Sequence, residues 1–212
     1  MLFCILGLMG NLSYGQSGVY FAKIKTYHSK KLGITFDYPA NLKIREKKGV
    51  ITIEHNIKFK HPDPCDGSGL PQYQFSNKIY DFYVQISIIS KNMNIAFSSN
   101  PLLPNIVVIE SDEISKIPVD GLATYGKLKG IWQYNGNHGC GPFTYLFQLT
   151  HDGLDNKDKF LKVNEYPAPE FNRSAVSDED IQVYSRLRQI LLPEQRKRIF
   201  SEILSSLKYG KK

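Results

Sequence analysis

The C-terminal stretch carries the clearest hydrophobic pattern in the chain. Its apolar residues recur three and four positions apart, which is the spacing that places them on one face of an α-helix. Pro193 suits the first helical position, because its missing N–H would have no partner there. The pattern predicts an amphipathic helix that begins at Pro193, ends by Gly210 and covers a β-sheet. The apolar positions are Ile199, Phe200, Ile203, Leu204 and Leu207.

Most of the preceding chain alternates apolar and polar residues with the period of two that half-buried strands require. The longest such segment is 80–89, in which Phe82, Val84, Ile86 and Ile88 share one face. Lys48-Gly49 predicts a hairpin turn between strands at 42–45 and 50–55. The other predicted strands are 19–27, 33–39, 106–110, 122–134, 143–151 and 159–166, with an irregular stretch at 92–104.

A second helix is predicted near the C-terminus, where Ser177 resembles a helix N-cap and Asp180 lies at the third helical position. Its apolar face would comprise Ile181, Tyr184, Leu187 and Leu191. Strands therefore come first in the chain and helices come last. This order predicts one α+β domain from 19 to 212, with a mainly antiparallel sheet on which the helices pack.

The first fifteen residues predict export from the cytoplasm. The apolar run at 2–9 carries no charge and is too short to span a bilayer. Ser13 and Gly15 place small residues at the two positions that a signal peptidase reads before its cut. We therefore predict that 1–15 is a signal peptide and that the mature protein is secreted or periplasmic, with no transmembrane segment. The alternative is that the apolar run is a buried first strand.

Removal of that segment would leave two cysteines, Cys65 and Cys140. An even pair in an oxidising compartment predicts a disulfide, and closing a loop of about 75 residues would stabilise the fold by roughly 4 kcal/mol in the chain-entropy treatment. His61 and His138 lie close to the cysteines in sequence, so the four side chains form an alternative tetrahedral zinc site. Separate, reduced thiols are a third alternative. We predict the disulfide, and no cofactor.

Basic residues give the chain a formal net charge of +7. The basic clusters at 29–31, 45–48 and 196–198 are short and far apart in sequence, which predicts a solvated surface rather than a binding patch. No nucleic-acid-binding module is recognisable, so we expect no nucleic-acid partner. Phosphate-binding loops, serine-hydrolase elbows and zinc-protease motifs are also absent from the sequence.

Two segments resemble a known family. Residues 32–42 (LGITFDYPANL) resemble the opening of PsbP-like domains, and residues 200–209 (FSEILSSLKY) resemble their closing helix and last strand. The family includes an extrinsic subunit of photosystem II and many secreted bacterial proteins. The resemblance implies an α/β/α sandwich and an accessory or binding role. Both segments are packing motifs, so the resemblance transfers no functional residue.

These features predict a secreted or periplasmic accessory or binding module without catalytic activity, whose partner is an unknown protein or surface ligand. One alternative is a metal-binding protein that uses His61, Cys65, His138 and Cys140. The other is a small hydrolase or thiol enzyme with an unrecognised site. No catalytic residue is predicted, and the sequence defines neither the ligand nor the oligomeric state.

The intact mass of the exported protein tests both the signal peptide and the disulfide. We expect a chain that has lost residues 1–15 and that takes up an alkylating reagent at Cys65 and Cys140 only after reduction. A full-length chain with two reactive thiols and an added metal mass would contradict both predictions and favour the zinc site.

Overall fold

The computed structural model describes residues 23–58, 78–90, 93–97, 107–111, 120–136, 141–151, 154–167, 179, 182–183 and 189–210. For 93–97, 107–111, 150–151 and 154–158 only the backbone is described. The predicted signal segment, residues 1–15, lies outside these residues.

Strands dominate the described chain. They are β1 (Ile24–Ser29), β2 (Ile34–Pro39), β3 (Lys43–Lys47), β4 (Val50–Lys58), β5 (Lys78–Ser90), β6 (Met93–Phe97), β7 (Val107–Ser111), β8 (Gly121–Tyr125), β9 (Leu128–Tyr134), β10 (Phe143–His151), β11 (Leu154–Tyr166) and β12 (Lys208–Tyr209). One complete helix, α2 (Pro193–Ser206), is described. Glu179, Gln182 and Val183 are also helical and belong to the stretch predicted as the second helix.

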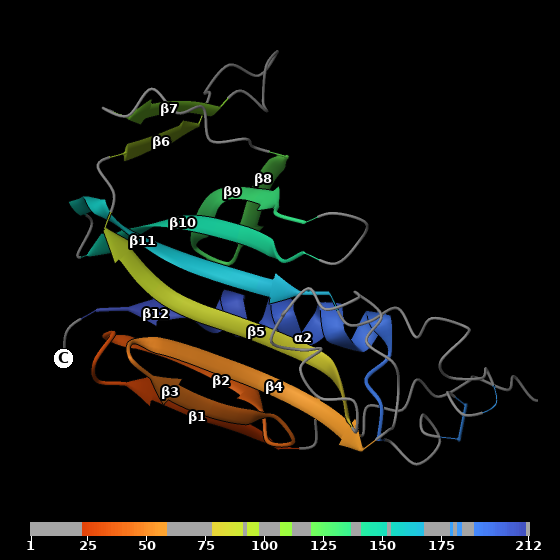
Figure 1. Cartoon of the computed structure of the whole chain (residues 1–212). Coiled ribbons are helices and arrows are strands. Elements are labelled where there is room, and N and C mark those ends of the chain that lie inside the picture. Colours follow the sequence, from red (N-terminus) through yellow and green to blue (C-terminus); the bar gives the residue numbers. More distant parts are fainter. Residues whose placement is uncertain are drawn as a thin grey trace, which may run out of the picture.

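The strands form three antiparallel groups. The main sheet has the order β3-β4-β5-β11-β10-β9-β8, a small sheet has the order β1-β2-β12, and β6 pairs with β7 (Figure 1). In Figure 1, α2 lies behind β5 and β11, on one face of the main sheet. The helix also contacts β2, so the small sheet and the main sheet share one helix.

The α+β prediction was wrong, and so was the α/β/α sandwich that the PsbP-like resemblance implied. The described chain is mostly antiparallel β-sheet with one complete helix. Two segments add strands that the pattern did not separate. Residues 122–134 form a hairpin, β8 and β9, and the stretch that begins at 92 contains β6. Alternation of apolar and polar residues continues through a tight turn, so it does not show where a strand reverses.

Gly126 explains the reversal between β8 and β9. Its φ is +58°, in the left-handed region that favours glycine. A Cβ added there would also lie only 2.7 Å from the carbonyl oxygen of Ser205, at the end of α2. The turn therefore needs glycine both for its backbone conformation and for its close contact with the helix.

The core face of the main sheet is built from aligned apolar residues. Ile51 lies opposite Ile86, Ile86 opposite Val163, Val163 opposite Tyr145, and Tyr145 opposite Trp132. This single row crosses five strands, and its members are buried or partly buried in one hydrophobic cluster. Cross-strand pairs of this kind are what stabilises a sheet.

The apolar stripe of α2 covers that face, as the sequence predicts. Ile199, Phe200, Ile203 and Leu204 are each no more than 3% exposed. The helix begins at Pro193, again as predicted. Within the described part of the chain, no helix has both the length and the apolar character needed to cross a lipid bilayer.

The end of α2 comes earlier than expected. The helix stops at Ser206, because the chain then extends to pair with β2. Lys208 lies opposite Thr35 and Tyr209 opposite Ile34, which makes β12 the third strand of the small sheet. The small sheet therefore joins the beginning of the described chain to its end.

Replacement of Ile203 by alanine tests the contribution of the α2 stripe. Ile203 is 1% exposed, so Ile203→Ala should lower the free energy of unfolding by about 2–5 kcal/mol, through lost burial and the cavity left behind. Ile24 is 50% exposed, so the matched change Ile24→Ala should cost only about 0.5 kcal/mol. Urea denaturation followed by Trp132 fluorescence measures both changes. Similar losses in the two variants would contradict the assignment of α2 to the core.

Candidate functional site

A β-bulge in β5 positions the first acidic residue of the candidate site. The register against β4 passes from His55–Phe82 to Asn56–Tyr80, so Asp81 is the extra residue on β5. A bulge disrupts the alternation of its strand and can redirect a side chain. Asp81 is accordingly buried, with 0% exposure, and its carboxylate contacts the chain that leads into α2.

Both carboxylate oxygens of Asp81 have partners. Oδ2 accepts the backbone N–H of Leu191 at 2.6 Å, and Oδ1 lies 2.6 Å from Nδ1 of His55. A carboxylate oxygen accepts hydrogen bonds, so the Nδ1–H of His55 donates to it. The side chain of His55 is 13% exposed, which shields the pair from solvent. Asp81 therefore joins β4, β5 and the start of α2.

Glu165 on β11 is the second acidic residue of the site. The O–H of Tyr145 donates to its Oε2 at 2.9 Å. Burial raises the pKa of Glu165, and the hydrogen bond from Tyr145 and the positive charge of Arg196 oppose that rise. Burial and the charge of Glu165 also raise the pKa of Tyr145, so the phenol keeps its proton and donates.

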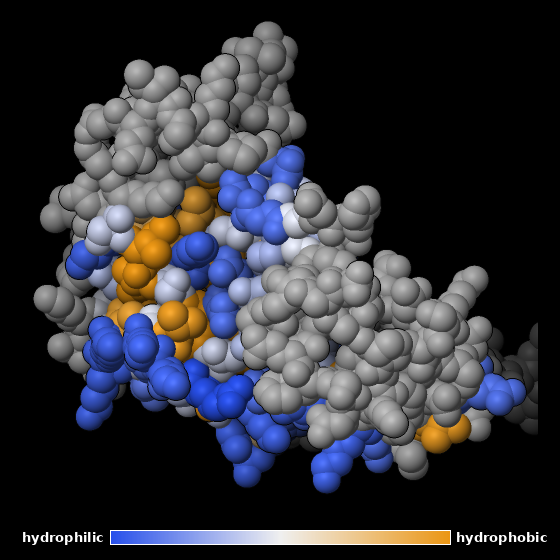
Figure 2. Space-filling view, viewed as in Figure 1, coloured by the Kyte–Doolittle hydropathy of each residue, from blue (hydrophilic) through white to orange (hydrophobic). Residues whose placement is uncertain are grey.

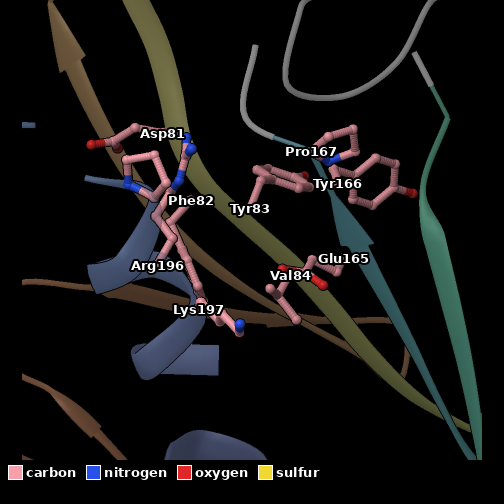
Figure 3. Close-up of a pocket in the computed structure, with 10 residues that line it drawn as sticks. Asp81, Phe82, Tyr83, Val84, Glu165, Tyr166, Pro167, Arg196 and Lys197 are labelled. Carbon is pink, nitrogen blue, oxygen red and sulfur yellow. The ribbon is translucent and has the colours of Figure 1, made fainter. Parts of the chain in front are cut away.

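A cavity of about 260 Å³ lies where β5, β11 and the first turns of α2 meet (Figure 3). Figure 3 shows Arg196 and Lys197 extending from α2, with Glu165 and Val84 on the strands beside them. Ten residues line the cavity: Asp81, Phe82, Tyr83, Val84, Glu165, Tyr166, Pro167, Pro193, Arg196 and Lys197. Its walls combine aromatic and proline rings with two acidic and two basic groups.

A tyrosine cluster makes the end of β5 and β11 rigid. Tyr80 and Tyr83 meet edge to face with their ring centroids 5.4 Å apart, and Tyr83 meets Tyr166 in the same way at 5.4 Å. The O–H of Tyr166 donates to Oε1 of Gln85 at 3.0 Å. Such edge-to-face contacts add about 0.5–1.5 kcal/mol each beyond the area buried. The strand wall of the cavity is therefore held in place before any ligand arrives.

Only some of the residues that the sequence points to lie in the described part of the chain. His61, Cys65, His138 and Cys140 lie outside the described residues, so the disulfide and the alternative zinc site stay predictions. Among the residues that the structure does describe, no group of three or more His, Cys, Asp or Glu could hold a metal ion. Trp132 packs against the core, as expected of an aromatic residue in an apolar strand.

The sequence did not single out Asp81 or Glu165. Asp81 is the one charged residue in the segment 80–89, which is otherwise rich in apolar and aromatic side chains, and that contrast was the available signal. Glu165 lies in a segment, 159–166, that also contains two lysines and an asparagine, so it does not stand out. Strict alternation would place Asp81 on the face opposite Phe82. The bulge depends on pairing with β4, and a pattern read within one segment does not contain that information.

Comparisons with protein-family models and with curated proteins find no match. A crystal structure of a protein from Bacteroides thetaiotaomicron VPI-5482 is similar at a TM-score of 0.40 and 8% identity, over 87% of this chain and 48% of that one. The chain therefore spans about half the length of that protein. A TM-score of this size does not establish a shared fold, and the resemblance to PsbP-like domains stays a prediction.

The raised pKa of Glu165 predicts how stability depends on pH. The folded protein holds this proton more tightly than the unfolded chain does. The contribution of Glu165 to stability is therefore fully present below the ordinary pKa of 4.5 and is lost as pH rises through the folded-state pKa. Glu165→Gln should remove that loss, so the variant should gain stability relative to the wild type as pH rises from about 4 to about 8.

Melting temperatures measured across this pH range provide the test. Glu194→Gln, a matched change at an exposed position in the first turn of α2, should keep the wild-type dependence on pH because Glu165 is still present. Parallel profiles for the wild type and Glu165→Gln would show that burial of Glu165 has no energetic consequence, and would contradict the prediction.

Proposed function

We propose that the protein is an extracytoplasmic binding module without catalytic activity, and that the cavity beside α2 binds a small organic anion or an anionic group of a larger partner. The observation that carries the proposal is the contrast between the acidic groups of the cavity and Lys197. The acidic groups have structural partners, whereas Lys197 extends from the surface of α2 into the lining.

The acidic groups are engaged in holding the fold together. Asp81 bonds to Leu191 and His55, and Glu165 accepts a hydrogen bond from Tyr145. A general acid or base must reach the reacting group and exchange a proton with it. The contacts of Asp81 and Glu165 favour fixed positions instead, which supports binding over catalysis.

The basic groups suit an anion. Arg196 and Lys197 lie in the first turns of α2, where the positive end of the helix dipole adds to their charge. A carboxylate or phosphate that contacts Lys197 would therefore experience net attraction.

The remaining walls suit the apolar part of such a ligand. Phe82, Val84, Pro167 and Pro193 contribute apolar surface to the cavity. Ligand sites typically combine apolar walls with a few polar groups and span about 300–1,000 Å³. A cavity of about 260 Å³ is just below that range, so it fits a compact ligand or one side chain of a partner.

The extracytoplasmic part of the proposal has separate support. Residues 1–15 have the apolar run and small cleavage-site residues of a signal peptide, and the two remaining cysteines form an even pair. The resemblance of residues 32–42 and 200–209 to PsbP-like domains is consistent with an accessory role.

A thermal-shift screen against small carboxylates and phosphomonoesters tests the binding function. A true ligand at about 100 times its Kd should stabilise the fold by about 2.7 kcal/mol, because it binds only the folded state. Calorimetry should then show that Lys197→Gln weakens binding by about tenfold, the expected loss of one charged contact of about 1.5 kcal/mol.

Lys127→Gln is the matched control. Lys127 is exposed in the turn between β8 and β9, outside the cavity lining, so its replacement should leave the affinity unchanged. The cavity proposal fails if no anion stabilises the protein, or if Lys127→Gln weakens binding as much as Lys197→Gln does. Conversion of the bound compound into a product would contradict the non-catalytic role.

A further inference from the structure

The positive charge of the protein is concentrated in one part of the fold. Residues 23–58, which form β1 to β4, contain eight lysines and one arginine against three acidic residues. Their net charge is thus +6, and that of the whole chain is +7. The charge is therefore not spread over the surface.

Two hairpin turns bring four of these lysines together. Lys30 and Lys31 follow β1, and Lys47 and Lys48 lie where β3 turns into β4; all four are exposed. A Cβ added to Gly49 would lie 3.7 Å from Cε and 3.8 Å from Nζ of Lys31, so the two turns are in contact. We call these four lysines the basic tip.

The strands behind the turns are also joined. The O–H of Tyr27 on β1 donates to Oε2 of Glu46 on β3 at 2.9 Å. Figure 1 places both turns at the same end of the molecule, and Figure 2 shows hydrophilic residues gathered at that end, at the lower left. The basic tip is thus a continuous feature of the surface rather than two separate clusters.

The acidic residues of this region contact residues of β1 and β3 that are not part of the basic tip. Asp37 accepts the O–H of Thr26 at 2.6 Å, Glu46 accepts that of Tyr27, and Glu54 pairs with Arg45 at 2.5 Å. A hydrogen bond from a hydroxyl does not cancel the charge of a carboxylate, so only Glu54 is neutralised, by Arg45, and the net charge of +6 already counts all three acidic residues. Four lysines that gather in a region of net charge +6 repel one another and attract an anionic surface.

The backbone of Lys48 adopts a conformation that is uncommon for lysine. Its φ is +52° and that of Gly49 is +79°, as in the type I′ turn that forms the two-residue loop of a β-hairpin. Asparagine and glycine suit the first of these positions better than lysine does. Lys48 thus occupies a position where the backbone favours asparagine or glycine. Its side chain adds a positive charge to the basic tip.

We propose that the basic tip docks the protein on the anionic surface of a phospholipid bilayer. The two turns are in contact at one end of the molecule, so a single surface would meet lysines from both. Lysine is a flexible point charge that suits the diffuse charge of lipid headgroups, whereas specific phosphate recognition favours the planar fork of arginine. Polybasic segments bind such membranes in the same way.

Docking through the tip leaves the cavity accessible. At the tip, Val50 pairs with Ser87, whereas the cavity is lined by residues 81–84 of the same strand. The cavity therefore lies farther along β5, away from the proposed membrane contact. The membrane proposal does not depend on the cavity having a ligand.

Flotation of the mature protein with lipid vesicles tests the proposal. We expect binding to phosphatidylcholine vesicles that contain about 30% phosphatidylglycerol, no binding to pure phosphatidylcholine, and loss of binding as salt is raised. Each lysine should contribute about fivefold to the affinity, so the double variant K30Q/K47Q should bind about 25-fold more weakly.

The matched control is K23Q/K58Q, which removes the same charge from the opposite ends of β1 and β4. It should bind anionic vesicles with nearly wild-type affinity, and both double variants should keep the wild-type melting temperature. Equal losses in the two variants would show that only net charge matters and would overturn the proposal. Failure of the wild type to float, or preference for soluble dextran sulfate over vesicles, would overturn it too, the latter in favour of an acidic polysaccharide.

Discussion

The burial of one helix face determines the arrangement of the whole structure. The four buried residues of α2 pack against the core face of the main sheet, and the same helix contacts β2. Burial of a side chain of this size contributes about 1.5–3 kcal/mol, more than the net value of about 1 kcal/mol for a typical hydrogen bond. This packing fixes the first turns of α2, and so it also places Pro193, Arg196 and Lys197 beside β5 and β11 to complete the cavity.

The sequence predicts those features that depend on short segments. The start of α2 at Pro193, the turn at Lys48-Gly49 and the apolar face of β5 all follow from local spacing and backbone preference. The fold class did not follow, because it depends on how many strands form and where they reverse. In the segment 122–134 a single glycine, Gly126, makes one expected strand into two, and its close contact with Ser205 arises only in the folded chain.

The candidate surfaces depend on pairing between distant segments, which explains why the sequence did not reveal them. Asp81 becomes buried because the register between β4 and β5 shifts at His55. The basic clusters at 29–31 and 45–48 are separated along the chain, and for that reason they predicted a dispersed charge. Contact between the two turns, seen at Gly49 and Lys31, brings them together.

The small sheet has a consequence for the time at which the protein can fold. β2 needs β12 as its partner, and the backbone N–H of Asp37 donates to the side chain of Ser206 across a separation of 169 residues. Ribosomes add about 5–20 residues per second, so β2 would wait on the order of ten seconds or more for β12 to be synthesised. During that interval Ile34 and Phe36 lack the helix that covers them in the finished fold. Completion of the small sheet therefore waits for the synthesis of β12, whatever part of the main sheet has formed by then.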